Sequence, residues 1–213
     1  MSDRLEVRDL TLERGHRTLF AALAIDLAPG ELLQLQGPNG SGKSSLLRAL
    51  LGLTPVRSGT IDWAGARFAP ASGRLRRDAL YQGHASGQKG ELTALENLAL
   101  AAALDGSPTG ATALQAALDA VGLGPAQALA ARRLSQGQRQ RLALARLALP
   151  NPRRLWLLDE PSAALDRDGA ARLDALLAAH LARGGAAIVA THLPLLAGRP
   201  TRRLALDAVP VAA

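Results

Sequence analysis

Residues 37–44 combine closely spaced glycines with a lysine and a serine, a composition suited to binding phosphate. Glycines let successive backbone N–H groups wrap around phosphate oxygens, and a helix that starts directly after such a loop adds its positive end. The segment follows the pattern G-x4-G-K-[ST] and consists of Gly37, Pro38, Asn39, Gly40, Ser41, Gly42, Lys43 and Ser44. We expect Lys43 to reach the β and γ phosphates of ATP, Ser44 to bind Mg²⁺, and Ser45 to add a nucleotide contact.

Two carboxylates stand directly after an apolar run later in the chain. The run Leu155–Leu158 is typical of a buried strand, and Asp159 and Glu160 follow it. Asp159 is suited to holding Mg²⁺ through water, and Glu160 to orienting the water that attacks the γ phosphate. Together with the phosphate loop, this pair predicts an enzyme that hydrolyses ATP with Mg²⁺.

A third motif points to a family. Leu134-Ser135-Gln136-Gly137-Gln138 precedes a basic helical stretch and resembles LSGGQ, the signature of ABC ATPases, with Gln136 in place of the first glycine. The residues alone predict that Ser135 caps a helix whose N-terminus is an anion site, and the alternative is a simple capped helix. The resemblance implies that Ser135, Gly137 and Gln138 contact ATP.

The resemblance covers nearly the whole chain. Residues 161–166 are similar to the D-loop, which in the family crosses the dimer interface, so Asp166 is expected near a shared nucleotide. His192 follows an apolar run and is similar to the switch histidine that contacts the γ phosphate; a purely structural histidine is the alternative. The resemblance also implies that two copies pair head to tail, each signature meeting the ATP bound by the other copy.

Two positions depart from the family pattern. The family usually stacks an aromatic residue on adenine at the position of Arg14. Arg14 or His16 could stack instead through a planar cation, and the alternative is an exposed turn arginine. The family glutamine that senses Mg²⁺ and the γ phosphate falls in register on His84, with Gln82 two residues earlier. We therefore expect His84 at the metal and the nucleotide; the alternative is that Gln82 senses them.

The stretch from Tyr81 to Asn97 is similar to haem-exporter ATPase subunits of bacterial cytochrome c maturation. That resemblance implies a peripheral ATPase on the cytoplasmic face of the inner membrane, bound to integral membrane permease subunits and powering haem export or haem release. The alternatives are the ATPase of another compact ABC transporter, a soluble ABC ATPase outside transport, and a nucleotide-binding module that does not hydrolyse ATP.

Alternating strands and helices must position these motifs. Apolar patterns predict strands at 5–12, 24–27, 31–36, 59–63, 155–158 and 186–190, a helix ending before Gly52, and a helix at about 169–183. This order predicts an α/β fold of the P-loop NTPase class and ABC ATPase type. We expect a mixed sheet core, an N-terminal antiparallel β subdomain and a helical insert at about 84–148, within one domain spanning 1–213.

Composition narrows the chemistry and the partners. The 213 residues include no cysteine, which excludes disulfides, thiolate catalysis and cysteine-based metal sites. The net charge of +7 could indicate a nucleic acid partner, but the arginines are scattered and aromatics make up only 2%. We therefore expect no nucleic acid partner. The apolar stretches are also too short for a membrane-spanning helix.

Overall fold

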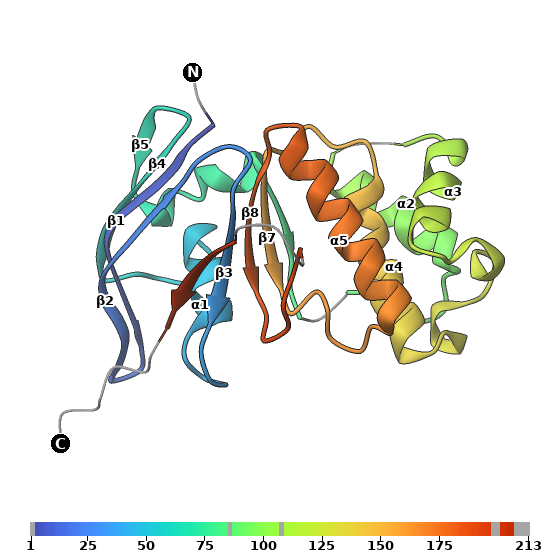
Figure 1. The fold of residues 1–213 in the computed structure, drawn as a ribbon, viewed down its shortest axis with the longest axis horizontal. Helices are drawn as coiled ribbons and strands as arrows, with labels where there is room; N and C mark the ends of the chain where they lie inside the picture. Colours follow the sequence, from blue (N-terminus) through green and yellow to red (C-terminus); the bar gives the residue numbers. More distant parts are fainter. Residues whose placement is uncertain (1–2, 85–86, 107–108, 197–200, 207–213) are drawn as a thin grey trace. The chain divides into compact units, whose positions relative to one another are not determined.

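The computed structural model describes residues 3–84, 87–106, 109–196 and 201–206 (Figure 1). The chain divides into two compact units. The first comprises Met1–Gly83, Arg153–Glu160 and Ala179–Ala213 and holds both β-sheets; the second comprises His84–Pro152 and Pro161–Ala178 and is largely helical. Within the described ranges, no helix is both long and apolar enough to cross a membrane.

An antiparallel sheet carries the N-terminal part of the first unit. Its strand order is β2-β1-β4-β5, formed by β1 (Leu5–Arg14), β2 (Arg17–Leu27), β4 (Ser58–Trp63) and β5 (Ala66–Phe68). The buried residues of β1 change from odd to even numbers after Val7, because a register shift at Asp9, whose φ is 51°, keeps Leu10 on the core face. The predicted antiparallel β subdomain is confirmed.

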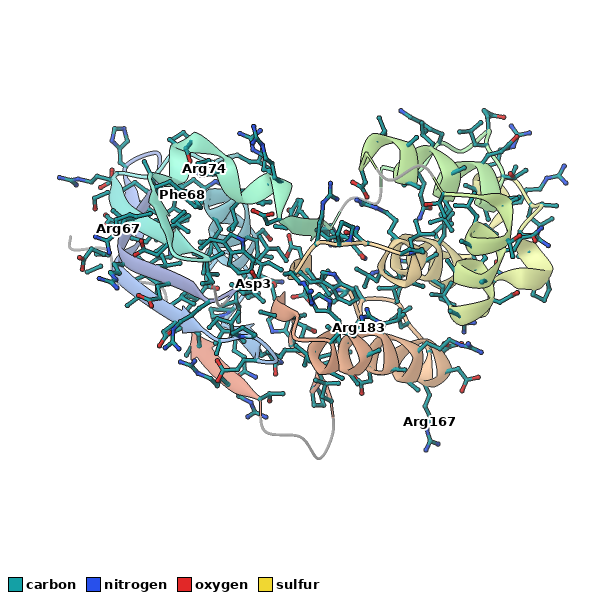
Figure 2. The ribbon with its side chains drawn as sticks, turned by 90° about the horizontal axis from the view of Figure 1, so that it is seen from above. Asp3, Arg67, Phe68, Arg74, Arg167 and Arg183 are labelled. Carbon is teal, nitrogen blue, oxygen red and sulfur yellow. The ribbon has the colours of Figure 1, made fainter. Side chains whose placement is uncertain are left out.

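A short segment of 3₁₀ helix leads from the antiparallel sheet to the second sheet. It consists of η1 (Pro70–Ser72) and η2 (Arg74–Arg77). The Arg74 guanidinium lies 5.4 Å from the centroid of the Phe68 ring. Both side chains are labelled in Figure 2. This cation–π contact packs the segment against the end of β5.

The parallel sheet of the first unit has the strand order β6-β7-β8-β3-β9. Its strands are β3 (Leu32–Gln36), β6 (Ala79–Gln82), β7 (Leu155–Asp159), β8 (Ala186–Ala190) and β9 (Arg202–Ala205). Each neighbouring pair is parallel, so the carboxyl ends of β3, β7 and β8 lie at one edge of the sheet. The α/β fold is confirmed, and it contains two sheets: the antiparallel pairs all lie in the first sheet and the parallel pairs all lie in the second.

Helix α1 (Lys43–Leu50) packs against one face of the parallel sheet. Its Leu46, Leu47 and Leu50 join a buried core cluster with alternate residues of the strands, among them Leu157 and Ile188. Because side chains alternate along a strand, Gln34, Trp156, Leu158 and Gln82 lie on the opposite face.

The second unit is built from α2 (Ala94–Leu104), α3 (Ala111–Ala120) and α4 (Gln136–Ala148), with η3 (Gly124–Ala126) and η4 (Ala131–Arg133) between them. Thr93 caps α2, because its hydroxyl accepts from the Glu96 N–H at 3.1 Å and the Glu96 carboxylate accepts from the Thr93 N–H at 2.8 Å. Helix α5 (Arg167–Ala182) begins in the second unit and ends in the first.

His180, near the end of α5, is the most strongly perturbed histidine of the first unit. Its ring stacks on Trp156 with centroids 3.9 Å apart, and its Nε2–H donates to the Ala186 carbonyl at 3.1 Å. The pKa of His180 is lowered to about 4, chiefly by burial and in part by the nearby cations Arg183 (Figure 2) and Arg154, while hydrogen bonds to backbone carbonyls oppose the shift. His180 is therefore neutral in the folded protein near pH 7.

Acidification should destabilise the fold through His180. The unfolded chain takes up this proton near pH 6.5 and the folded chain only near pH 4, so the free energy of unfolding should decrease as pH falls between these values. This decrease in the free energy of unfolding is at most about 3 kcal/mol. Urea unfolding of wild type and His180→Phe at several pH values would measure this decrease, and the phenylalanine variant should show a shallower one.

His16 offers the matched control, because it is an exposed histidine at the turn between β1 and β2. His16→Phe should retain the wild-type pH dependence of unfolding. A His180→Phe variant with the full wild-type pH dependence would contradict the assignment of this effect to His180.

Candidate functional site

The glycine-rich loop lies between the carboxyl end of β3 and the first turn of α1. Gly37, Gly40 and Gly42 have φ angles of 148°, 82° and 100°, which side-chain-bearing residues rarely adopt. A Cβ atom on Gly37 would lie 2.5 Å from the Leu206 carbonyl oxygen. The loop therefore needs glycine both for its backbone angles and for space.

The first turn of α1 presents a free positive end. Its N-cap is Gly42, which has no side chain to cap the helix, and the first turn holds no acidic residue. The N–H groups of a first turn have no partner within the helix, and the helix dipole favours an anion beside them. Ser44, the predicted Mg²⁺ ligand, and Ser45, a predicted nucleotide contact, both lie in this turn.

Lys43 is held at the mouth of the loop. It is 7% exposed, and its ammonium donates to the carbonyls of Gly37 at 2.7 Å and Pro38 at 3.2 Å. Of the other loop residues, Asn39 is exposed, whereas Ser41 is 2% exposed and its hydroxyl has no hydrogen-bond partner among the described residues. The Ser41 hydroxyl is therefore a buried polar group of the loop whose hydrogen bonds a ligand would complete.

Asp159 and Glu160 lie where β7 ends. Asp159 is 2% exposed, alternation along β7 places it on the face of α1, and its Oδ2 has no partner among the residues described. Glu160 has a φ of 50°, unusual for a residue with a side chain, and its N–H donates to the Ala190 carbonyl at 2.8 Å. Such backbone strain is characteristic of functional sites.

His192 connects the loop and the carboxylate. Its Nε2 lies 3.4 Å from the Lys43 ammonium and 3.4 Å from Oε1 of Glu160. A neutral imidazole nitrogen either accepts from Lys43 or donates to Glu160, but it does not do both at once. The predicted catalytic residues Lys43, Glu160 and His192 therefore meet at one edge of the parallel sheet.

The donor set at this edge fits a magnesium ion bound with a nucleotide. Among the described residues, no group of three or more His, Asp or Glu side chains could hold a metal on its own. Mg²⁺ commonly takes one or two protein ligands and completes its shell with phosphate oxygens and water. The unpartnered oxygen of Asp159 is a ligand of this kind.

The structure places Arg14 and His84 at exposed positions and Gln82 in a buried strand. Arg14 is exposed at the turn between β1 and β2, and His84 is an exposed residue at the start of the second unit. Gln82 pairs with Leu158 and shares its face, opposite to α1, so its side chain points away from the face that carries Asp159. This orientation disfavours Gln82 as the metal sensor, and the role of His84 stays a prediction.

The signature segment belongs to the second unit. The Ser135 hydroxyl accepts from the Gln138 N–H at 3.2 Å, and the Gln138 side chain accepts from the Ser135 N–H at 2.9 Å. The predicted N-cap is therefore confirmed. A Cβ on Gly137 would lie 3.1 Å from the Ala164 carbonyl oxygen, so glycine lets α4 approach the segment after β7 closely.

Two residues that the sequence analysis missed tie α4 to the segment before α5. The Gln140 side chain donates to the Pro161 carbonyl at 2.9 Å, and Arg141 pairs with Asp166. Asp166 also accepts from the Gly169 N–H at 2.8 Å, and this bond, followed by Arg141, lowers the pKa of Asp166. Glutamine and arginine on a helix are too common for sequence to single them out.

Comparison with known proteins identifies the family. Residues 20–163 match the model of the ABC transporter family. A cytochrome c biogenesis ATP-binding export protein, CcmA 2 of Cupriavidus metallidurans, is 47% identical over 96% of both chains. A CcmA of Pseudomonas aeruginosa is 44% identical over 90% of this chain and 94% of its own.

Solved structures agree with this result. A putative ABC transporter ATP-binding protein from Pyrococcus furiosus superposes with a TM-score of 0.81 at 21% identity, over 95% of this chain and 97% of the other. An ATP-binding cassette solved as a dimer with ADP and Pi gives a TM-score of 0.75 at 25% identity, over 89% of this chain and 88% of the other. With a phosphate loop, a strand-end carboxylate pair and a capped signature helix in place, the chain belongs to the ABC transporter family of ATP-binding proteins.

Proposed function

We propose that this chain is the ATP-hydrolysing subunit of an ABC transporter complex that powers haem export or haem release in c-type cytochrome biogenesis. The observation that carries the proposal is the meeting of Lys43, Glu160 and His192 at the carboxyl edge of the parallel sheet. High identity to cytochrome c biogenesis export proteins over most of the chain supports the pathway.

Hydrolysis would begin with nucleotide in the glycine-rich loop. Lys43 would exchange its contacts with the Gly37 and Pro38 carbonyls for β and γ phosphate oxygens. Ser44 and Asp159 would hold Mg²⁺, which supplies positive charge against the phosphate oxygens. Glu160 would accept a hydrogen bond from the attacking water, and His192 would contact the γ phosphate.

Arg14 and His84 would complete the contacts of a single copy. Arg14 is placed at an exposed turn, where its guanidinium is free to stack on a purine base. His84 would accept a hydrogen bond from metal-bound water through a neutral ring nitrogen, in place of the family glutamine.

The signature would act on nucleotide bound by a second copy. At the start of α4 the Ser135 cap uses the Gln138 N–H, while the N–H groups of Gln136 and Gly137 precede the first intrahelical bond. These groups and the helix dipole would form an anion site for the nucleotide of the second copy. Asp166 would lie near the same shared nucleotide. A dimeric ATP-binding cassette among the similar structures supports the pairing of two copies.

A groove in the second unit is suited to a permease segment. It has a volume of about 300 Å³ and lies between α2 and α4, with an apolar lining that includes Leu98, Leu100 and Leu142. The lining also includes Leu104, which is 79% exposed, and the ion pair of Arg146 and Asp105 at 2.8 Å. An amphipathic helix of an integral membrane subunit would bury this apolar surface and hold the ATPase at the cytoplasmic face of the inner membrane.

Replacing Glu160 with glutamine should separate ATP binding from hydrolysis. The amide keeps the shape of the side chain but lacks the negative charge that orients water, so turnover should fall by roughly 10² or more while ATP still binds. Phosphate release and binding of a fluorescent ATP analogue would measure the two quantities. Glu6→Gln, which removes a surface carboxylate paired with Arg8, is the control and should retain full turnover. Near wild-type turnover in Glu160→Gln would exclude Glu160 as the catalytic carboxylate.

Mixing two inactive variants should test the shared site. Ser135→Arg places bulk and charge at the start of α4, and Lys43→Ala removes the phosphate contact, so each variant alone should be inactive in hydrolysis. A dimer containing one of each retains one intact pair of loop and signature. If one site turns over alone, part of the hydrolysis activity should therefore return on mixing. Circular dichroism would confirm that both variants fold. Tethering the two copies in one chain fixes their ratio, and a folded tethered dimer without activity would contradict a single-site version of this proposal.

Placing a charge on the groove should weaken the complex. Leu104→Asp is expected to reduce copurification with the integral membrane subunit and the yield of haem-stained c-type cytochrome in cells, because a carboxylate would be desolvated in the interface. ATP hydrolysis by the isolated chain should persist, because Leu104 is exposed. Leu129→Asp is the matched control, since Leu129 is 41% exposed and does not line the groove. Unchanged copurification and cytochrome yield with Leu104→Asp would rule out this docking surface.

A further inference from the structure

The segment that carries His192 lies just beyond the end of the sheet. The pairing of β8 with β3 ends at Ala190 opposite Leu35, and the Thr191 N–H makes a last backbone contact with the Leu35 carbonyl at 3.4 Å. His192 itself is half exposed and belongs to no strand. Its position therefore depends on contacts other than the strand ladder.

Gln34 supplies those contacts from inside the sheet. It is 1% exposed, and its Nε2 donates to the Thr191 carbonyl at 3.2 Å and to the Leu193 carbonyl at 3.0 Å. The two carbonyls belong to the residues immediately before and after His192. The Thr191 hydroxyl closes the same turn by accepting from the Leu193 N–H at 3.2 Å.

We propose that Gln34 is a positioning residue that fixes His192 between Lys43 and Glu160. Both partners of Gln34 are carbonyl oxygens, which only accept, so the task requires a group with two N–H donors. Glutamate at this position would offer only acceptors when ionised, and asparagine would be shorter by one methylene. The inference rests on the proposed role of His192 at the γ phosphate.

The geometry leaves His192 little tolerance. Its Nε2 is 3.4 Å from both Lys43 Nζ and Glu160 Oε1, so a displacement of the backbone at 191–193 changes both distances. Displacements of about 1 Å in a catalytic group can cost roughly 10²-fold in rate. Gln34 touches neither Lys43 nor Glu160 through a hydrogen bond that the structure shows, and it would act through His192.

The most direct test observes the His192 ring itself. Gln34→Met keeps a side chain of similar length but removes both donors. In ¹⁵N-labelled protein, the ring resonances of the four histidines can be assigned by single substitutions. We expect the His192 ring resonances to shift in Gln34→Met and the exposed His16 resonances to stay. Gln82→Met is the matched control, because Gln82 is also a buried glutamine on the same face of the sheet.

Activity gives an independent readout through a double-mutant cycle. Gln34→Met should lower kcat roughly 10- to 100-fold with little change in binding of ATP, and Gln82→Met should not. In a His192→Ala background the further addition of Gln34→Met should have almost no effect, because the residue through which Gln34 acts is gone. Thermal melting would confirm that each variant folds; if Gln34→Met does not fold, Gln34→Asn, whose amide is set back, serves in its place.

Failure of this inference and failure of the proposed function have different signatures. Unshifted His192 resonances in Gln34→Met, or equal losses of kcat from Gln34→Met with and without His192, would overturn the positioning role. Full hydrolysis by His192→Ala would instead remove His192 from the proposed mechanism. The ring resonances would still decide in that case whether Gln34 fixes its position.

Discussion

The parallel pairing of every neighbouring strand in the order β6-β7-β8-β3-β9 is the constraint on which the functional site depends. It places the residues after β3, β7 and β8 at one edge, although they lie far apart in sequence. Lys43, Glu160 and His192 reach that edge from three separate chain segments. The leucines of α1 pack on the sheet face below them and hold the phosphate loop in register with the strand ends.

The site combines strain with unpartnered polar groups. Glu160 is held at a φ of 50°, and buried oxygens of Asp159 and Ser41 have no hydrogen-bond partner among the described residues. Both features cost stability, and in the proposed mechanism bound ATP and Mg²⁺ would satisfy these polar groups. The buried leucine cluster of α1 and the parallel strands contributes stability that offsets this loss.

Residues in local motifs could be predicted from the sequence. The glycines of the phosphate loop and the Ser135 cap follow rules that act over a few residues, and the structure contains positive φ angles at those glycines and the predicted Ser135 cap. The face on which Gln82 lies could not be predicted, because it depends on register with β7. The partners of Gln34 and Gln140 depend in the same way on segments distant in sequence. One signal was nevertheless present: Gln34 lies between the apolar residues Leu33 and Leu35, and a buried amide needs partners.

In the proposed mechanism, Lys43, Glu160 and His192 surround the γ phosphate of one bound ATP. A crystal structure of Glu160→Gln grown with Mg-ATP would measure this directly, because the slowed variant keeps the nucleotide intact. We predict γ phosphate oxygens within hydrogen-bond distance of the Lys43 ammonium and the His192 ring, with the metal ion beside Asp159. Nucleotide bound away from the loop, or a γ phosphate that none of these side chains reaches, would contradict this arrangement.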